Sequence, residues 1–138
     1  MNVLVDTTVW SLALRRRREK LSSLEQDLVM EWEDLAGSGR AVLMGPIRQE
    51  VLSGIREEKA FAALQVRLSK FRSLEVLPGD YDQAARFFNA CRSRGISGTS
   101  IDMLICATAF RYKVPIFTTD PDFPQYARHV PIRLHSRV

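Results

Sequence analysis

The 138-residue sequence contains few of the features that mark secreted, membrane or thiolate-metal proteins. Its two cysteines, Cys91 and Cys106, both fall in helical patterns, so they form neither a disulfide framework nor a paired metal site. Its apolar runs are far shorter than the ~20 residues of a membrane-spanning helix. The segment from Met1 to Asp6 lacks a basic start and meets an acid too early for a signal peptide. We therefore expect a cytoplasmic protein that has no membrane partner.

The composition is that of an ordinary globular protein. Apolar residues make up 46% and charged residues 26% of the chain, which is unlike a disordered segment. The length is that of one compact domain, residues 1–138, with enough chain to bury its own core. A net charge of +4 permits a polyanionic partner without requiring one.

Short apolar segments alternate with helical patterns along the whole chain. This alternation predicts a three-layer α/β/α sandwich with a central, mainly parallel sheet. Five strands are expected, and they are Asn2 to Val5, Ala41 to Met44, Leu74 to Leu77, Val114 to Phe117 and Val130 to Leu134. The predicted helices are one capped by Thr7 or Thr8, then 22–35, 47–53, 55–71, 81–94 and one capped by Thr99 or Ser100.

The first two predicted helices each carry a distinctive residue pattern. We expect Leu24, Leu28, Trp32 and Leu35 to lie together on the inward face of the second helix. The run Arg15 to Arg18 is predicted to continue the first helix. Four consecutive arginines would cover every side of a helix, so a solvated helix end and an RNA contact are equally compatible with the pattern.

Four acidic residues fall where such a fold places its functional crevice, outside the carboxyl ends of the strands. Asp6 directly follows the first strand and Asp120 follows the fourth, while Glu50 and Asp102 lie in helices. Converging carboxylates repel one another unless a cation neutralises them. Because no His or Cys accompanies these oxygens, the pattern favours Mg²⁺ or Mn²⁺ over zinc.

Each acid also has an ordinary structural explanation. Asp6 and Asp120 taken singly are typical of turn or cap residues. Asp102 alone could complement a helix dipole, and Glu50 alone is typical of a solvated helix. The metal-site interpretation therefore depends on their joint placement at one edge of the sheet.

Four ordered motifs carry a family resemblance. They are Val3-Leu4-Val5-Asp6-Thr7-Thr8-Val9-Trp10, Gln49-Glu50-Val51-Leu52-Ser53-Gly54, Ser100-Ile101-Asp102-Met103-Leu104-Ile105-Cys106-Ala107-Thr108-Ala109 and Thr118-Thr119-Asp120-Pro121-Asp122-Phe123. Together they resemble the motifs of PIN domains, and in particular those of the VapC-type ribonuclease toxins of prokaryotic toxin–antitoxin pairs. The resemblance spans Val3 to about Leu134. Each motif alone is weak, whereas the ordered set is specific.

The resemblance implies an endoribonuclease that depends on Mg²⁺ or Mn²⁺ and cleaves RNA phosphodiester bonds with a metal-activated water. It implies that the acidic quartet is Asp6, Glu50, Asp102 and Asp120, with Asp122 as a further metal ligand and Thr8 and Thr118 as supporting hydroxyls. It also implies a small antitoxin protein as partner and a homodimer. Pro121 departs from the pattern locally, because it stiffens the loop that carries Asp122.

Three other functions are compatible with parts of the sequence. A solitary PIN-type RNA-processing nuclease would share the same site. A phosphatase could use Asp6 as a covalent nucleophile, although enzymes of the haloacid dehalogenase type require a second Asp where this chain has Thr8. A non-catalytic RNA-binding module would need the basic surface and none of the acids. His129 and His135 lie outside the motifs and are not expected to act as general bases.

Overall fold

The computed structural model describes residues 1–136 and is built on a parallel four-stranded sheet. The strands are β1 (Val3–Val5), β2 (Ala41–Met44), β3 (Arg72–Leu74) and β4 (Ile116–Phe117). Their order across the sheet is β3-β2-β1-β4, and every pairing is parallel. β1 and β2 are buried along their whole length, which explains why both are uninterrupted apolar runs.

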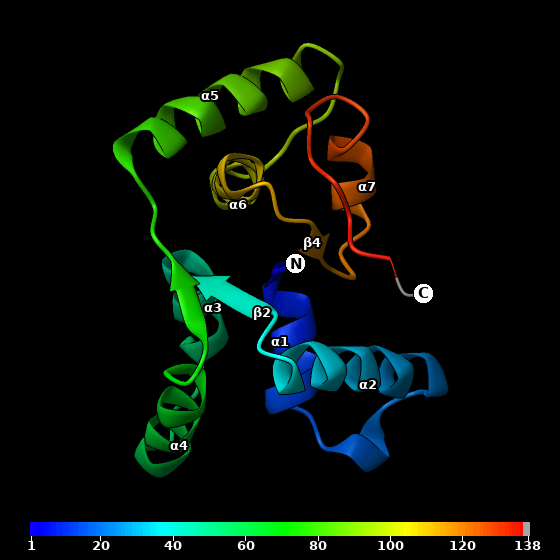
Figure 1. Ribbon diagram of the computed structural model, residues 1–138, viewed down its shortest axis with the longest axis vertical. Helices are drawn as coiled ribbons and strands as arrows, with labels where there is room; N and C mark the ends of the chain where they lie inside the picture. Colours follow the sequence, from blue (N-terminus) through cyan, green and yellow to red (C-terminus); the bar gives the residue numbers. More distant parts are fainter. Residues whose placement is uncertain (137–138) are drawn as a thin grey trace.

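Helices cover both faces of this sheet, which gives the three layers predicted from the sequence. In Figure 1, α5, α6 and α7 lie on one side of the strands, and α1, α2 and α4 lie on the other. The helices are α1 (Thr7–Leu14), α2 (Ser23–Gly37), α3 (Gly45–Leu52), α4 (Glu58–Leu68), α5 (Pro78–Arg92), α6 (Ser100–Tyr112) and α7 (Asp122–Tyr126), with a short 3₁₀ helix at Arg18–Lys20. Within residues 1–136, none of these helices has the length and apolarity that a membrane crossing requires.

The prediction of five strands was wrong in its last member. The segment near Leu134 makes an isolated parallel bridge to Ile116 and no longer ladder. Ile116 N–H donates to the Arg133 carbonyl and His135 N–H donates to the Ile116 carbonyl. β4 is only two residues long, so few of its backbone groups can pair with this segment. Pro131 also has no N–H to donate to a ladder. The third strand was also misplaced, because β3 ends at Leu74 and Pro78 begins α5.

The ends of the first two helices differ from expectation as well. Asp6, rather than Thr7 or Thr8, occupies the N-cap position of α1. α1 ends at Leu14, so the arginine run does not continue it. Leu24 is 64% exposed instead of inward-facing, because the buried stripe of α2 is formed by Val29, Trp32 and Leu35.

The capping predictions were more successful. Ser22 begins α2 with a capping box, in which its hydroxyl accepts from Glu25 N–H and the Glu25 carboxylate accepts from Ser22 N–H. Thr99 caps α6, and its Oγ1 accepts from Asp102 N–H at 3.0 Å. This cap sets the first turn of α6, and so the position of Asp102.

An ion pair between buried Asp80 and exposed Arg111 fastens α5 to α6. The Arg111 guanidinium donates to both Asp80 oxygens, at 2.7 and 2.9 Å, while Leu77 N–H donates to the same carboxylate. Burial opposes ionisation of Asp80, but the Arg111 and Leu77 hydrogen bonds outweigh it and lower its pKa. The arrangement holds α6, and therefore Asp102, at a fixed position over the sheet.

Candidate active site

The strand order changes direction beside β1, and the acidic residues gather there. The chain passes from β1 to β2 to β3 on one side and then returns to place β4 on the other side of β1. In parallel sheets such a switch point leaves a crevice outside the carboxyl ends of the two strands. Asp6 follows β1 and Asp120 follows β4 after two threonines, so both enter that crevice.

Asp6 is the most deeply placed of these acids, with 5% of its surface exposed. Thr118 Oγ1 donates to Asp6 Oδ2 at 2.8 Å, and Thr8 Oγ1 donates to the same oxygen at 3.4 Å. Burial is the main cause that raises the pKa of Asp6, and the charges of Glu50 and Asp120 raise it further. Ionised Asp6 is therefore costly in this crevice unless positive charge compensates it.

The two predicted supporting threonines link the first and last motifs of the site. Thr8 Oγ1 and Thr118 Oγ1 lie 3.5 Å apart. Thr8 Oγ1 accepts from Thr119 N–H, and Thr118 Oγ1 accepts from Asp120 N–H. These contacts fasten the loop after β4 to the start of α1, so they fix Asp120 relative to Asp6.

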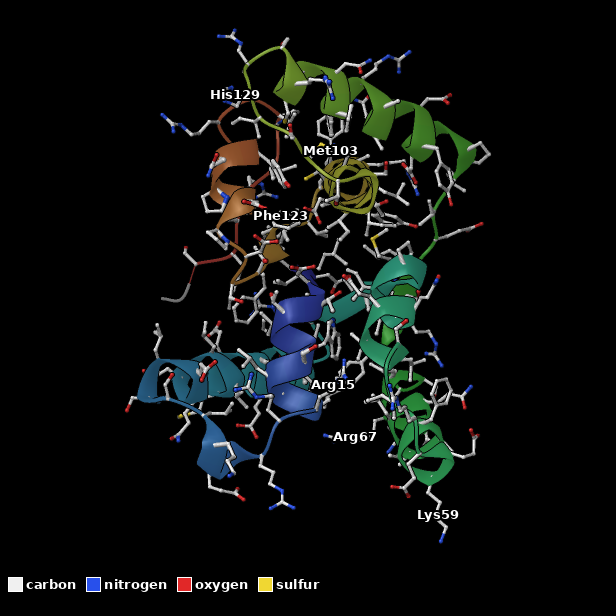
Figure 2. All side chains as sticks on the ribbon, turned by 180° about the vertical axis from the view of Figure 1, so that it is seen from behind. Arg15, Lys59, Arg67, Met103, Phe123 and His129 are labelled. Atoms are coloured by element: carbon white, nitrogen blue, oxygen red, sulfur yellow. The ribbon has the colours of Figure 1, made fainter. Side chains whose placement is uncertain are left out.

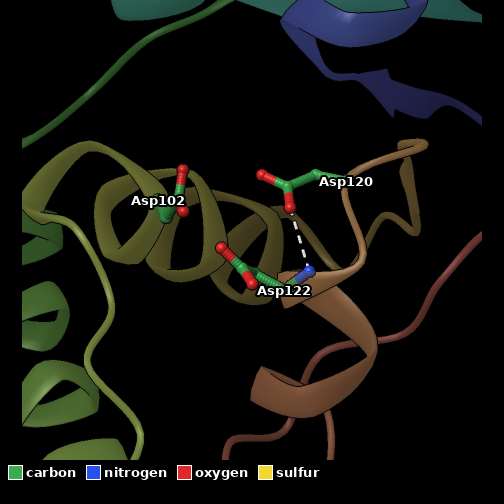
Figure 3. Close-up of side chains that lie close together, drawn as sticks. All are labelled: Asp102, Asp120 and Asp122. Atoms are coloured by element: carbon green, nitrogen blue, oxygen red, sulfur yellow. Dashed lines mark hydrogen bonds between the residues drawn. The ribbon is translucent and has the colours of Figure 1, made fainter.

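Three carboxylates lie close enough to share one cation. One oxygen each from Asp102, Asp120 and Asp122 lies within 4.8 Å of the others, and the three side chains converge in Figure 3. Asp122 N–H donates to Asp120 Oδ1 at 2.9 Å, which is the dashed line in that figure. The sequence left the geometry of Asp122 open because of Pro121; here Pro121 precedes α7, whose first residue is Asp122.

Asp102 is half-buried beside this group and accepts a hydrogen bond that the sequence did not reveal. Tyr126 Oη donates to Asp102 Oδ2 at 2.8 Å. Burial raises the pKa of Asp102, and the charges of Asp120 and Asp6 raise it further, although the Tyr126 bond opposes them. Burial and the Asp102 contact also raise the pKa of Tyr126.

Glu50 lies at the rim of the site, not in the three-carboxylate group. It is exposed on α3 and accepts from Thr7 Oγ1 at 3.2 Å. A cavity of about 520 Å³ nevertheless brings Asp6, Glu50, Asp102 and Asp120 together. The cavity thus contains all four acids that the sequence singled out.

The same cavity is lined by several residues that sequence reasoning did not assign to the site, among them Thr7 and Arg16. Thr7 lies next to Asp6 and orients Glu50. Arg16 lines the cavity together with Leu24, Glu25 and Leu28, which belong to α2. No sequence signal separates Arg16 from its three neighbouring arginines, because the distinction arises where α1 ends.

The remaining candidate groups lie elsewhere. His135 Nε2 lies 2.8 Å from Glu31 Oε1, and His129 lies beyond the end of α7. Cys91 and Cys106 are buried and free, as small apolar residues would be, and burial raises the pKa of both thiols. None of these four residues lines the acidic cavity.

A crevice at the switch point with converging acids is the arrangement expected of a PIN domain. The sequence model of the PIN-domain family matches residues 3–129 of this chain. Ribonuclease VapC11 of Mycobacterium tuberculosis is 30% identical over 128 residues, which cover 91% of this chain and 92% of that protein. The chain belongs to the PIN-domain family, within its group of VapC ribonucleases.

Solved structures show the same fold at lower identity. VapBC2 from Rickettsia felis, solved bound to a DNA fragment from its promoter, matches with a TM-score of 0.74 at 13% identity, covering 98% of each chain. Mycobacterium tuberculosis VapC20, described as a sarcin-ricin loop cleaving toxin, matches with a TM-score of 0.66 at 18% identity. That match covers 96% of this chain and 99% of VapC20.

Proposed function

We propose that this chain, as a single domain of residues 1–138, hydrolyses RNA phosphodiester bonds with a divalent cation held by its acidic cluster. The observation that supports this proposal most directly is the convergence of three carboxylates, because one oxygen each of Asp102, Asp120 and Asp122 lies within 4.8 Å of the others. Asp6 and Glu50 line the cavity that also includes Asp102 and Asp120. RNA as substrate is supported by the 30%-identical ribonuclease VapC11. Asp6, Glu50, Asp102 and Asp120 are the proposed catalytic residues.

The residues present fit a hard divalent cation. All the converging donors are carboxylate oxygens, which suit Mg²⁺ or Mn²⁺. Oxygens bound to one Mg²⁺ lie about 3–4 Å apart, so small side-chain rotations would bring this group into place. Asp102 and Asp120 would hold the ion, Asp122 would add a ligand, and Asp6 and Glu50 would complete the negative field. When bound, the ion supplies positive charge to a phosphodiester oxygen and lowers the pKa of water.

The protein's own residues supply order and charge. Thr118 and Thr8 keep the Asp6 carboxylate in one orientation, and Thr7 does the same for Glu50. Because burial raises the pKa values of Asp6 and Asp102, these two acids bind protons more readily than ordinary carboxyl groups when the cation is absent. Cation binding and proton binding at the site are therefore expected to compete.

Cleavage should depend on added metal. Protein stripped with EDTA is expected to leave a labelled single-stranded RNA intact, and Mg²⁺ or Mn²⁺ should restore cleavage, because the uncompensated acids repel phosphate. The products are resolved on a denaturing gel, with and without metal. Equal cleavage in EDTA would contradict the proposal.

The same preparation separates the competing functions. A phosphatase that used Asp6 as nucleophile would form an acid-labile phosphoaspartate, which a hydrolytic nuclease does not form. A non-catalytic module would bind RNA without metal and leave its length unchanged. A solitary RNA-processing nuclease would cleave in the same way, and the reading frame beside its gene would encode no small antitoxin.

Arg16 is proposed to contact an RNA phosphate beside the acids. It is the member of the arginine run that lines the acidic cavity, and it makes no salt bridge within residues 1–136. Arg18, by contrast, is paired with Glu33 at 3.3 Å. A cation facing an otherwise acidic cavity is placed to attract the phosphate that the carboxylates repel.

Replacing Arg16 should weaken RNA binding and reduce its salt dependence. In an inactive Asp6→Asn background, Arg16→Gln is expected to make the slope of log K against log salt shallower by about 0.7, the value for one phosphate contact on a single strand. Fluorescence anisotropy with labelled RNA at several salt concentrations measures it. Arg17→Gln, next in the run and outside the cavity, is the matched control. Identical slopes for the two variants would count against a phosphate contact at Arg16.

A small antitoxin protein is the proposed regulatory partner. The similar VapBC2 structure is a complex by its name. On this chain, Leu24 and Leu28 of α2 line the cavity beside Arg16, and Leu24 is largely exposed. An apolar wall next to an acidic centre suits a peptide that carries both apolar and basic residues. Co-expression with the product of the adjoining reading frame should suppress RNA cleavage.

A homodimer is proposed for the face formed by α5 and α6. Tyr81, Phe88, Ile101 and Leu104 line an apolar hollow there, and Tyr81 and Ile101 are exposed. Exposed apolar groups gathered in this way are typical of a protein interface. The mass of the particle in solution, measured by light scattering, should be twice that of the chain.

A further inference from the structure

Tyr126 is a fully buried residue whose hydroxyl reaches the acidic cluster. None of its surface is exposed, and its Oη donates to Asp102 Oδ2 at 2.8 Å. A buried hydroxyl requires a partner, and here that partner is a carboxylate proposed to hold a cation. Hydrogen bonds to an ionised acceptor are among the stronger ones in proteins.

The helix α7 presents both of its ends to the same cluster. It begins at Asp122 and ends at Tyr126, and residues four apart share one face of a helix. Asp122 contributes an oxygen to the three-carboxylate group, while Tyr126 orients Asp102. One short helix therefore fixes two of the three converging carboxylates.

The position of the Tyr126 ring is itself restricted by packing. Its centroid lies 5.2 Å from that of Phe123 in an edge-to-face arrangement. On another side, a Cβ added at Gly98 would lie 3.4 Å from Tyr126 Cε1 and 2.7 Å from Met103 Cε. Figure 2 labels Met103 on α6 and Phe123 on α7. The Tyr126 ring, and with it the hydroxyl, is therefore restricted by close packing against Phe123 and near Gly98.

We propose that Tyr126 is a positioning residue, which fixes the Asp102 carboxylate in the orientation that receives the divalent cation. This inference depends on the proposed metal-dependent nuclease function. The Tyr126 hydroxyl already occupies Asp102 Oδ2, so the cation would be received by the other oxygen, Oδ1. Second-layer groups of this kind commonly change metal affinity or activity by 10- to 100-fold.

Removing the hydroxyl should weaken metal binding more than RNA binding. Tyr126→Phe is expected to lower Mn²⁺ affinity by about 10-fold, measured by calorimetry on the metal-free protein, and excess Mn²⁺ should restore much of the cleavage rate. RNA affinity without metal should stay at the wild-type value. Tyr112→Phe is the matched control, because the Tyr112 hydroxyl bonds to the Glu75 backbone instead.

The outcomes distinguish this inference from the function on which it rests. Wild-type Mn²⁺ affinity in Tyr126→Phe, in a preparation where the unmodified protein cleaves RNA, would overturn the positioning role alone. Failure of the unmodified protein to bind Mn²⁺ or to cleave RNA would overturn the proposed function itself.

A second measurement needs no variant at position 126. The chain has three tyrosines, so ¹³Cζ-labelled tyrosine gives three signals, which Tyr81→Phe and Tyr112→Phe assign. Addition of Mg²⁺ should move the Tyr126 signal, because the carboxylate that accepts its hydrogen bond then binds the cation. The other two signals should stay in place. An unmoved Tyr126 signal under saturating Mg²⁺ would contradict the proposal.

Discussion

Asp6→Asn is expected to reduce RNA cleavage by about 100-fold or more while leaving the metal-free protein as stable as the unmodified one, or more stable. The loss follows from removing one of the charges that hold the cation, whose contribution to the transition state is several kcal/mol. The fold should survive because asparagine is nearly the same shape and its carbonyl oxygen can still accept from Thr118. The combination of lost activity and kept stability is typical of a functional acid.

The expected stability change has a defined pH dependence. The pKa of Asp6 is raised in the folded state, so between the unfolded pKa of about 4 and the higher folded pKa the folded protein binds more protons than the unfolded chain. Its contribution to stability is therefore favourable at low pH and is lost as the pH rises through the folded pKa. Asp6→Asn should lack this loss, and urea unfolding at several pH values without metal measures it.

Asp82→Asn is the matched control for Asp6→Asn. Asp82→Asn removes an exposed acid of α5 that does not line the cavity, and it should leave cleavage unchanged. Mg²⁺ should raise the unfolding temperature of the unmodified protein and of Asp82→Asn, but much less that of Asp6→Asn, because binding to the folded state alone stabilises it. Cleavage at the normal rate by folded Asp6→Asn would show that this carboxylate is not catalytic.

Trp10→Ala is expected to destabilise the protein by about 3–5 kcal/mol, the usual cost of truncating a large buried aromatic side chain. Trp10 has no exposed surface and packs edge-to-face against Trp32 and Phe71, with centroid distances of 5.6 and 4.8 Å. Its indole N–H also donates to the Val5 carbonyl at 2.8 Å, directly before Asp6. Truncation leaves a cavity where α1, α2 and the chain before β3 meet.

Urea unfolding followed by circular dichroism gives this free energy. Trp10→Phe keeps a ring in the core but leaves the Val5 carbonyl without its donor, so it should cost less than the alanine variant. Val66→Ala, at an exposed position of α4, should change stability by less than about 0.5 kcal/mol. A cost below about 1 kcal/mol for Trp10→Ala would mean that the aromatic group is not a main support of the core.

The sequence predicts those parts of the fold that depend on local pattern. β2 lies at the predicted residues, because Ala41 to Met44 is an apolar run flanked by turn residues. Ser22 and Thr99 are predicted as caps because a hydroxyl before an apolar pattern satisfies free N–H groups in almost any context. The gathering of four acids in one cavity follows from parallel topology, which places strand ends at one edge.

The misplaced features depend on tertiary contacts that carry no local signal. Leu24 fits the helical stripe of α2, but that helix is rotated so that Val29 lies inward instead. The segment near Leu134 has a strand-like composition, yet the adjoining strand is too short to pair with it. Tyr126 escaped notice because its partner Asp102 is 24 residues away, and a single tyrosine after two prolines resembles a core residue.

The cavity at the switch point also has a consequence for the synthesis of the protein. Its walls require residues from both ends of the chain, because Asp6 is held by Thr118 and Asp102 by Tyr126. A ribosome-bound chain that stops short of these later residues has Asp6 but lacks Thr118, which donates to it, and Tyr126, which donates to Asp102. The nascent polypeptide should therefore not cleave RNA until synthesis has passed residue 126. The proposed antitoxin protein can then already be available when nuclease activity first arises.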